Sequence, residues 1–245
     1  MEKLRVADLN LLIDYKYDTM KKQCPPYKAD FEKPNLTINI PKEEIIRLQK
    51  ENPLLSCDDV EYVYTGAAFY EALLHFNGFM LHSSGIVKDG RAYLFSADPG
   101  TGKSTHTSLW QKYFGEDEAK IIKGDTRCDA TFMPSYRKKE SGELYVYGTP
   151  WSGKTDKNIN MRVPIGAIVC LERSENNWVK EITPKEAIPF ILQQTIRPEN
   201  KSEMINLLTI LDKVLRTIKV YKMGCNMDME AVEVSYNSIK VEEKL

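Results

Sequence analysis

The sequence predicts an α/β protein with a mixed sheet, and three observations lead to this prediction. The apolar segment "RAYLFSA" runs directly into the glycine-rich stretch "DPGTGKST". A helical pattern then continues to Phe114, with Gly115 as its C-terminal cap. Before that segment, Asp89-Gly90 joins it to "FMLHSSGIVK", as in a tight hairpin. A hairpin implies antiparallel pairing, so we expect a mixed rather than a fully parallel sheet.

The residues before Gly78 predict a small α/β subdomain. Residues 4–12 and 36–40 alternate like short strands, and "PKEEIIRLQKEN" begins with a proline that a first helical turn tolerates. From Asp58 to Phe76, apolar residues at helical spacing predict a long, mostly buried helix. We therefore expect an N-terminal subdomain over residues 1–77 and a second domain over residues 78–245.

The second domain is expected to contain more strands and a helical C-terminal part. Strand patterns occur at residues 119–123, 143–147, 163–171 and 178–182. Thr183 and Glu186 have the spacing of a capping box at a helix start. A helical repeat from Met204 to Val214 follows, and "IKVYKM" then interrupts the helical region.

Composition excludes several classes of partner. The 34 basic residues balance the 35 acidic ones, which argues against nucleic acid or an acidic membrane as partner. The five cysteines are scattered without a C-x-x-C pair, so we expect reduced thiols rather than disulfides or a zinc site. No apolar run reaches the length of a signal peptide or a membrane span. We therefore expect a cytoplasmic protein.

The glycine-rich stretch has the pattern of a phosphate-binding loop (P-loop). In such loops, backbone N–H groups and a helix N-terminus converge on a phosphate, which requires small residues. Lys103 is placed to reach the β- and γ-phosphates, and the Ser104 hydroxyl to join a magnesium shell. The candidate nucleotide-binding residues of the loop are Pro99, Gly100, Thr101, Gly102, Lys103, Ser104 and Thr105.

Ala97 stands where the first glycine of the pattern is usual. The position lies at the strand end and an alanine adds only a methyl group, so we expect binding to be preserved. The alternative is an accidental glycine-rich turn.

An acid near the end of a neighbouring strand would complete such a site. In "AKIIKGDTRCD", Asp125 follows an apolar strand pattern at a Gly-Asp turn. This position fits a magnesium ligand or a catalytic base, and the alternative is a turn-forming aspartate. Asp129 is a weaker second candidate.

Four segments, "LHSSGIV", "SADPGTGKST", "IIKGD" and "YGTPWSGK", resemble in order and spacing the P-loop kinases related to HPr kinase/phosphorylase. Phosphoenolpyruvate carboxykinase is a more distant similarity. The resemblance covers about residues 78 to 240 and is closest to HPr-kinase-like proteins of undefined substrate. It implies a P-loop core with a mixed sheet like that of the HPr kinase catalytic domain. HPr kinases form hexamers, so a homo-oligomer is compatible with the resemblance.

The resemblance also implies roles for residues outside the loop. His82 matches a family histidine that lies near the transferred phosphate. The family carries two adjacent acids where this chain has Gly124-Asp125. Asp125 would therefore bind magnesium and act as the catalytic base, or would share these roles with another residue. Lys154 is a candidate clamp on transition-state charge, or part of a solvated turn on which Trp151 packs.

For four further side chains the sequence gives a less specific indication of function. Arg162 and Arg127 could neutralise a phosphate or an acceptor, but most arginines are surface residues. His75 is expected to be structural within the buried helix. His106 could approach a nucleotide or pack with Trp110, and neither histidine is assigned a catalytic role.

The sequence thus predicts a phosphotransferase that uses ATP and Mg²⁺ and modifies a hydroxyl on a protein, peptide or small molecule. The catalytic candidates are Asp125, Lys103 and His82, and the metal candidates are Ser104 and Asp125. The first alternative is a nucleotide-binding switch or inactive kinase-like module, motivated by Ala97 and the single acid. A carboxykinase ranks below both, because such enzymes are much longer and need further metal ligands.

Overall fold

The computed structural model describes residues 1–122, 129–134, 144–151 and 160–241. A three-stranded sheet is formed by β1 (Glu2–Val6), β2 (Leu9–Asp14) and β3 (Leu36–Asn39), in that order. β1 and β2 are an antiparallel hairpin, and β3 runs parallel to β2. The predicted strand region at residues 4–12 therefore contains a turn, at which Ala7 and Asp8 adopt positive φ of 51° and 62°.

Three helices and a 3₁₀ turn accompany this sheet. They are α1 (Asp18–Gln23), the 3₁₀ turn Pro25–Tyr27, α2 (Lys42–Glu51) and α3 (Cys57–Leu73). Ser56 and Asp59 form a capping box, which explains why α3 begins at Cys57. A second 3₁₀ turn, Leu74–Phe76, follows α3 and ends at Asn77, which is left-handed. The predicted long helix is thus confirmed as far as Leu73, and its last three residues form the 3₁₀ turn instead.

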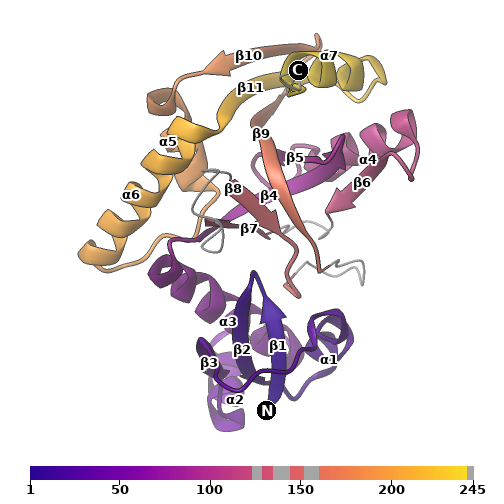
Figure 1. The fold of residues 1–245 in the computed structure, drawn as a ribbon. Coiled ribbons are helices and arrows are strands. Elements are labelled where there is room, and N and C mark those ends of the chain that lie inside the picture. The colour runs from indigo at the N-terminus through magenta and orange to yellow at the C-terminus, as the bar shows by residue number, and fades with distance from the viewer. Residues whose placement is uncertain (123–128, 135–143, 152–159, 242–245) are drawn as a thin grey trace.

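The larger sheet contains every described strand after Gly78. They are β4 (Phe79–Lys88), β5 (Arg91–Ser96), β6 (Ala119–Ile122), β7 (Asp129–Pro134), β8 (Leu144–Tyr147), β9 (Arg162–Arg173), β10 (Trp178–Ile182) and β11 (Lys219–Cys225). Their order is β10-β11-β9-β5-β4-β7-β8, with β6 also beside β4. The first sheet lies wholly before Gly78, so the chain changes sheets at this point (Figure 1).

The larger sheet is mixed, as the hairpin predicts. β4 and β5 are antiparallel, and Asp89 and Gly90 turn between them with positive φ of 51° and 69°. β9 runs parallel to both β5 and β11. The segment "IKVYKM" interrupts the helical C-terminal part, as predicted, but it also has a place in the sheet. Its residues 219–223 belong to β11, which lies between β9 and β10.

Two long strands link the main part of this sheet to β7 and β8. Residues 79–82 of β4 pair with β7, whereas residues 83–88 pair with β5. Residues 162–164 of β9 pair with β8, and the strand continues beside β5 from Ile165. Gly166 is the extra residue of a bulge here, and a Cβ on it would lie 2.9 Å from Cε1 of Tyr93.

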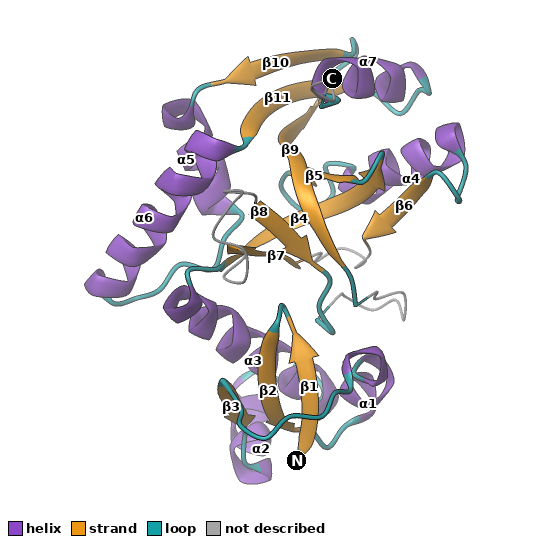
Figure 2. Ribbon diagram, viewed as in Figure 1, coloured by secondary structure: helices purple, strands orange, loops and turns teal. Residues whose placement is uncertain are grey.

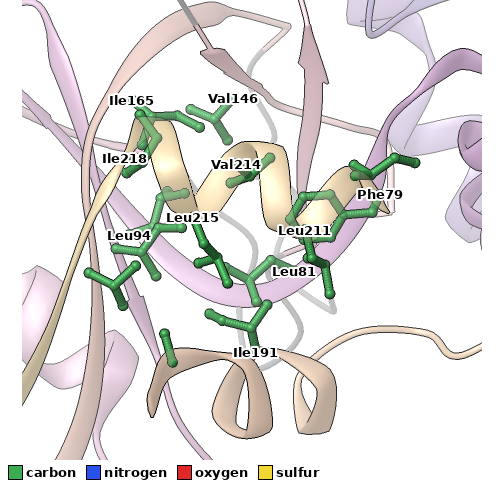
Figure 3. Packing of buried hydrophobic residues seen from close by; sticks show 14 of the residues in the cluster. Phe79, Leu81, Leu94, Val146, Ile165, Ile191, Leu211, Val214, Leu215 and Ile218 are labelled. Atoms are coloured by element: carbon green, nitrogen blue, oxygen red, sulfur yellow. The ribbon is translucent and has the colours of Figure 1, made fainter. Parts of the chain in front are cut away.

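Helices cover both faces of the main sheet, as the purple ribbons of Figure 2 show. On one face, α5 (Pro184–Gln193) and α6 (Lys201–Thr217) pack on Leu94, Ile168 and Val220 (Figure 3). On the other, α4 (Lys103–Phe114) and α7 (Glu230–Ile239) pack on the alternate strand residues, which include Phe95 and Val169. This alternation is what a sheet buried on both sides requires.

A further hydrophobic core joins the two sheets. Trp151 stacks on Phe69 of α3 with ring centroids 4.8 Å apart, and its indole Nε1 donates a hydrogen bond to Oγ1 of Thr65 (3.1 Å). Nearby, the Tyr147 hydroxyl donates to the carboxylate of Asp8 (2.7 Å). Within the described part of the chain, no helix is both long and apolar enough to cross a membrane.

Candidate active site

Three parallel strands, β5, β9 and β11, end at the same edge of the larger sheet. Ser96, Arg173 and Cys225 are their last residues. Ligands of open α/β sheets bind outside the carboxyl ends of such strands. The glycine-rich loop, residues 97–102, follows β5 directly and leads into α4 at this edge.

The loop has a backbone conformation that depends on its glycines. Gly100 and Gly102 have positive φ of 80° and 118°, a region that other residues rarely adopt. The Thr101 N–H donates to the Asp98 carbonyl (3.2 Å) and tightens the turn. Gly102 is the N-cap of α4 and makes no side-chain cap, and a helix N-terminus of this kind is a common binding site for anions.

Ala97 is buried in the core beneath α4 and α7. Its methyl group therefore packs against other apolar side chains. The alanine at this position is therefore accommodated by the core.

Lys103 is folded back onto the loop. Only 7% of its surface is exposed, and its Nζ donates to the carbonyl oxygens of Ala97 (2.7 Å) and Asp98 (3.3 Å). The ammonium group therefore lies inside the loop, where an anion bound to the backbone N–H groups would be within reach. Ser104 is half-buried and Thr105 is exposed, both in the first turn of α4.

Two residues that the sequence analysis did not single out hold the loop from outside. The Arg173 guanidinium at the end of β9 donates to the Gly100 carbonyl (2.6 Å). The Gln194 side-chain amide, just after α5, donates to the Asp98 carboxylate (2.8 Å). These partners lie 73 and 96 positions from the loop residues they contact, so no local spacing could have indicated them.

His82 of β4 is bound to the base of the loop through its backbone. Its N–H donates to the Gln194 carbonyl (2.7 Å), and its carbonyl accepts from the Ser96 hydroxyl (2.8 Å). The half-buried side chain lines a cavity of about 240 Å³ between β4 and α3. The other lining residues are Tyr62, Val63, Gly66, Ala67, Tyr70, Met80, Trp151 and Ile196. His82 thus lies between the loop and a mostly apolar cavity.

Asp125, Arg127 and Lys154 lie outside the described residues. Asp125 and Arg127 fall between β6 and β7. Both strands reach β4 near the candidate site, because Ile122 pairs with Gly85 and Asp129 pairs with His82. Before the segment that contains Lys154, Trp151 lines the same cavity as His82. Among the described residues, no group of three or more histidine, cysteine, aspartate or glutamate side chains could hold a metal ion.

Arg162 is not brought to the loop. It begins β9, whose opposite end carries Arg173, and at about 3.3 Å per residue the strand separates the two by roughly 36 Å of chain. Its guanidinium lies 3.5 Å from the Asp8 carboxylate and over the Tyr145 ring, 4.0 Å from the centroid. In this position the side chain links β9 to the turn between β1 and β2.

The remaining two histidines have opposite environments. His106 of α4 is 2% exposed and packs edge-on against Phe95, and its Nε2 lies 3.1 Å from the Trp110 indole nitrogen and 3.3 Å from the Ser235 hydroxyl oxygen. Burial lowers the pKa of His106 to about 4. His75, which we expected in a buried helix, lies in the 3₁₀ turn after α3 with its side chain 67% exposed. The expected helix ends at Leu73, and this explains the difference.

A second cavity, of about 390 Å³, lies between the loop and the ends of β9 and β11. Gly100, Gly102 and Thr105 form the wall nearest the loop. The remaining lining residues are Thr101, His106, Leu109, Arg173, Ser174, Cys225, Asn226 and Met227. The loop is therefore bordered by space on the α4 side, while His82 borders the cavity at α3.

No protein-family model and no curated protein matches the chain. Among solved structures, the chain is similar to the HPr(Ser) kinase/phosphatase from Coxiella burnetii, with a TM-score of 0.36 and 11% sequence identity. The match covers 65% of this chain and 95% of the other. At such values the likeness carries no argument about the function of this chain.

Proposed function

We propose that this protein is a Mg-ATP-dependent phosphotransferase. The observation that supports it most is the loop itself, in which two left-handed glycines, the uncapped start of α4 and the buried Lys103 ammonium converge. This combination of backbone donors, helix N-terminus and enclosed cation suits a polyphosphate.

In this proposal the loop holds the phosphates of ATP. Backbone N–H groups of Gly100 and of residues 102–104 would donate to phosphate oxygens, and Lys103 would move from the carbonyls of Ala97 and Asp98 to the β- and γ-phosphates. Ser104 and Asp125 are the residues that would hold Mg²⁺. When bound, the metal neutralises charge that develops on the transferred group.

The acceptor would approach from the His82 side. Its backbone is tied to the loop through Ser96 and Gln194, and its side chain lines the cavity at α3. Asp125 is the proposed base for the acceptor hydroxyl. It follows β6, whose last residue, Ile122, pairs with Gly85 of β4, the strand that carries His82. The acceptor is a hydroxyl on a protein, peptide or small molecule.

Calorimetric titration with Mg-ATP tests the proposal. We expect saturable binding by the wild-type protein and an affinity about 10- to 100-fold lower for Lys103→Ala, because one charge-assisted hydrogen-bonding group is lost. Lys112→Ala is the matched control, since Lys112 is an exposed lysine in the last turn of the same helix. Failure of the wild type to bind either ATP or GTP would overturn the proposal.

The nucleotide-binding switch is the second candidate, and the single acid Gly124-Asp125 favours it. Formation of ADP in the presence of candidate hydroxyl acceptors separates the two. Tight binding of Mg-ATP without turnover across protein, peptide and small-molecule acceptors would favour the switch.

A further inference from the structure

The cavity beside α4 leads away from the phosphate-binding part of the loop. Its lining extends from the loop glycines along α4 through Thr105 to Leu109, and it includes Met227. Met227 is 76% exposed. A volume of about 390 Å³ with apolar walls is within the range of small-molecule sites. If phosphates lie on the loop, the base of the nucleotide fits this cavity.

The hydrogen bonds around His106 determine which ring nitrogen carries the proton. The Ser235 hydroxyl donates to the Val232 carbonyl (2.9 Å), so its oxygen can only accept further bonds. The Trp110 indole N–H points to that oxygen at 2.9 Å, closer than its 3.1 Å to Nε2 of His106. The 3.3 Å contact between Nε2 and the Ser235 oxygen is then a hydrogen bond only if Nε2 is protonated.

In this tautomer Nδ1 of His106 is a bare acceptor. It is buried and has no hydrogen-bond partner in the structure. An unpaired buried acceptor is unfavourable, and a bound ligand that supplies a donor removes that cost. With Nε2 directed at Ser235 of α7, Nδ1 lies on the other side of the ring, and His106 is a wall residue of the cavity.

We propose that the cavity between α4 and the ends of β9 and β11 binds the nucleobase, and that His106 selects adenine by accepting a hydrogen bond from its 6-amino group. Guanine presents an oxygen acceptor at the same position, which would face the lone pair of Nδ1. Nδ1 is covered in the free protein, so the side chains over it must shift to admit the amino group while Nε2 keeps its bond to Ser235. This inference rests on the proposed nucleotide binding and adds the residue that determines base preference.

Calorimetry with three Mg-nucleotides tests the inference: ATP, GTP and purine riboside triphosphate, which lacks the 6-amino group. For the wild type we expect ATP to bind about 3- to 10-fold more tightly than the purine analogue, the value of one net hydrogen bond, and GTP to bind most weakly. His106→Phe keeps a ring against Phe95 but has no ring nitrogen, so its affinity for ATP should fall to its affinity for the purine analogue. The affinity of the analogue itself should change less than about twofold, since it makes no bond to Nδ1.

The comparison of nucleotides on the wild type needs no substitution, so it holds even if His106→Phe folds poorly. Equal affinity for ATP and the purine analogue, or a preference for GTP, would overturn the inference while leaving the proposed function intact. Binding of no nucleotide at all would overturn the proposed function, and the inference with it. A loss of binding in Lys103→Ala shows that the titration reports on the loop.

Discussion

His106 makes the stability of the folded protein depend on pH. The side chain is enclosed by Phe95, Trp110 and Ser235, and burial lowers its pKa to about 4, whereas an unfolded histidine titrates near 6.5. Because the folded pKa is the lower one, the unfolded chain binds the proton more readily. The contribution is therefore fully present above about pH 6.5 and is lost as the pH falls toward 4.

We expect the free energy of unfolding of the wild type, relative to His106→Phe, to fall by about 2 kcal/mol between pH 8 and pH 5, as linkage predicts for this pair of pKa values. Urea unfolding of both proteins at each pH measures this difference, and contributions from carboxylates cancel in it. A difference that does not change with pH would contradict the enclosed, neutral His106.

At the scale of elements, α6 shows how one apolar stripe holds a helix to the sheet. Its buried residues are Leu207, Ile210, Leu211, Val214 and Leu215, which recur at helical spacing and contact the core of Figure 3. Leu208 lies at the edge of this stripe and is 39% exposed, and Ile205 lies on the far side and is 55% exposed. Position on the helix, rather than residue type, thus decides what each leucine contributes.

Leu211→Ala should lower the free energy of unfolding by about 2–5 kcal/mol, because it removes buried methyl groups and leaves a cavity in a fully buried position. Leu208→Ala, the same change three residues earlier on a side chain that is 39% exposed, should cost less than about 1 kcal/mol. Urea unfolding followed by circular dichroism compares the two. Similar losses in both variants would mean that α6 does not pack as described.

At the scale of the whole molecule, Trp151 connects the two sheets. It follows β8 of the larger sheet, yet its ring stacks on Phe69 and its N–H is bound by Thr65, both in α3. Gly66 lies against the same ring, since a Cβ there would be 3.0 Å from Cδ1 of Trp151. The small subdomain therefore shares its core with the larger one, and we expect the chain to unfold as one unit.

Trp151→Ala should destabilise the protein by about 3–5 kcal/mol, the usual cost of deleting a buried aromatic ring. Trp151→Phe keeps a ring against Phe69 but loses the hydrogen bond to Thr65, and should cost about 1–2 kcal/mol. Urea unfolding by circular dichroism measures both, and the wild type should show a single transition. Two separate transitions in the wild type would show that the sheets fold independently.

Much of the local architecture could be predicted from the sequence. The hairpin at Asp89-Gly90, the capping box of Thr183 and Glu186, and the extent of α4 from the loop to Gly115 all agree with the structure. The strand β7 was not predicted, and the role of "IKVYKM" as a strand inside the sheet was not recognised. A short apolar segment does not show whether another strand lies beside it.

Turns, helix caps and the strand-loop-helix order around Lys103 follow from the sequence, because they depend on neighbours within a few residues. Which side chains surround the loop depends on the tertiary structure. Arg173 and Gln194 reach it from β9 and α5, whereas Arg162 binds Asp8, 154 positions away, instead. The physical reason is that turn and cap geometry is local, whereas strand order and helix packing bring together residues that are far apart in the sequence.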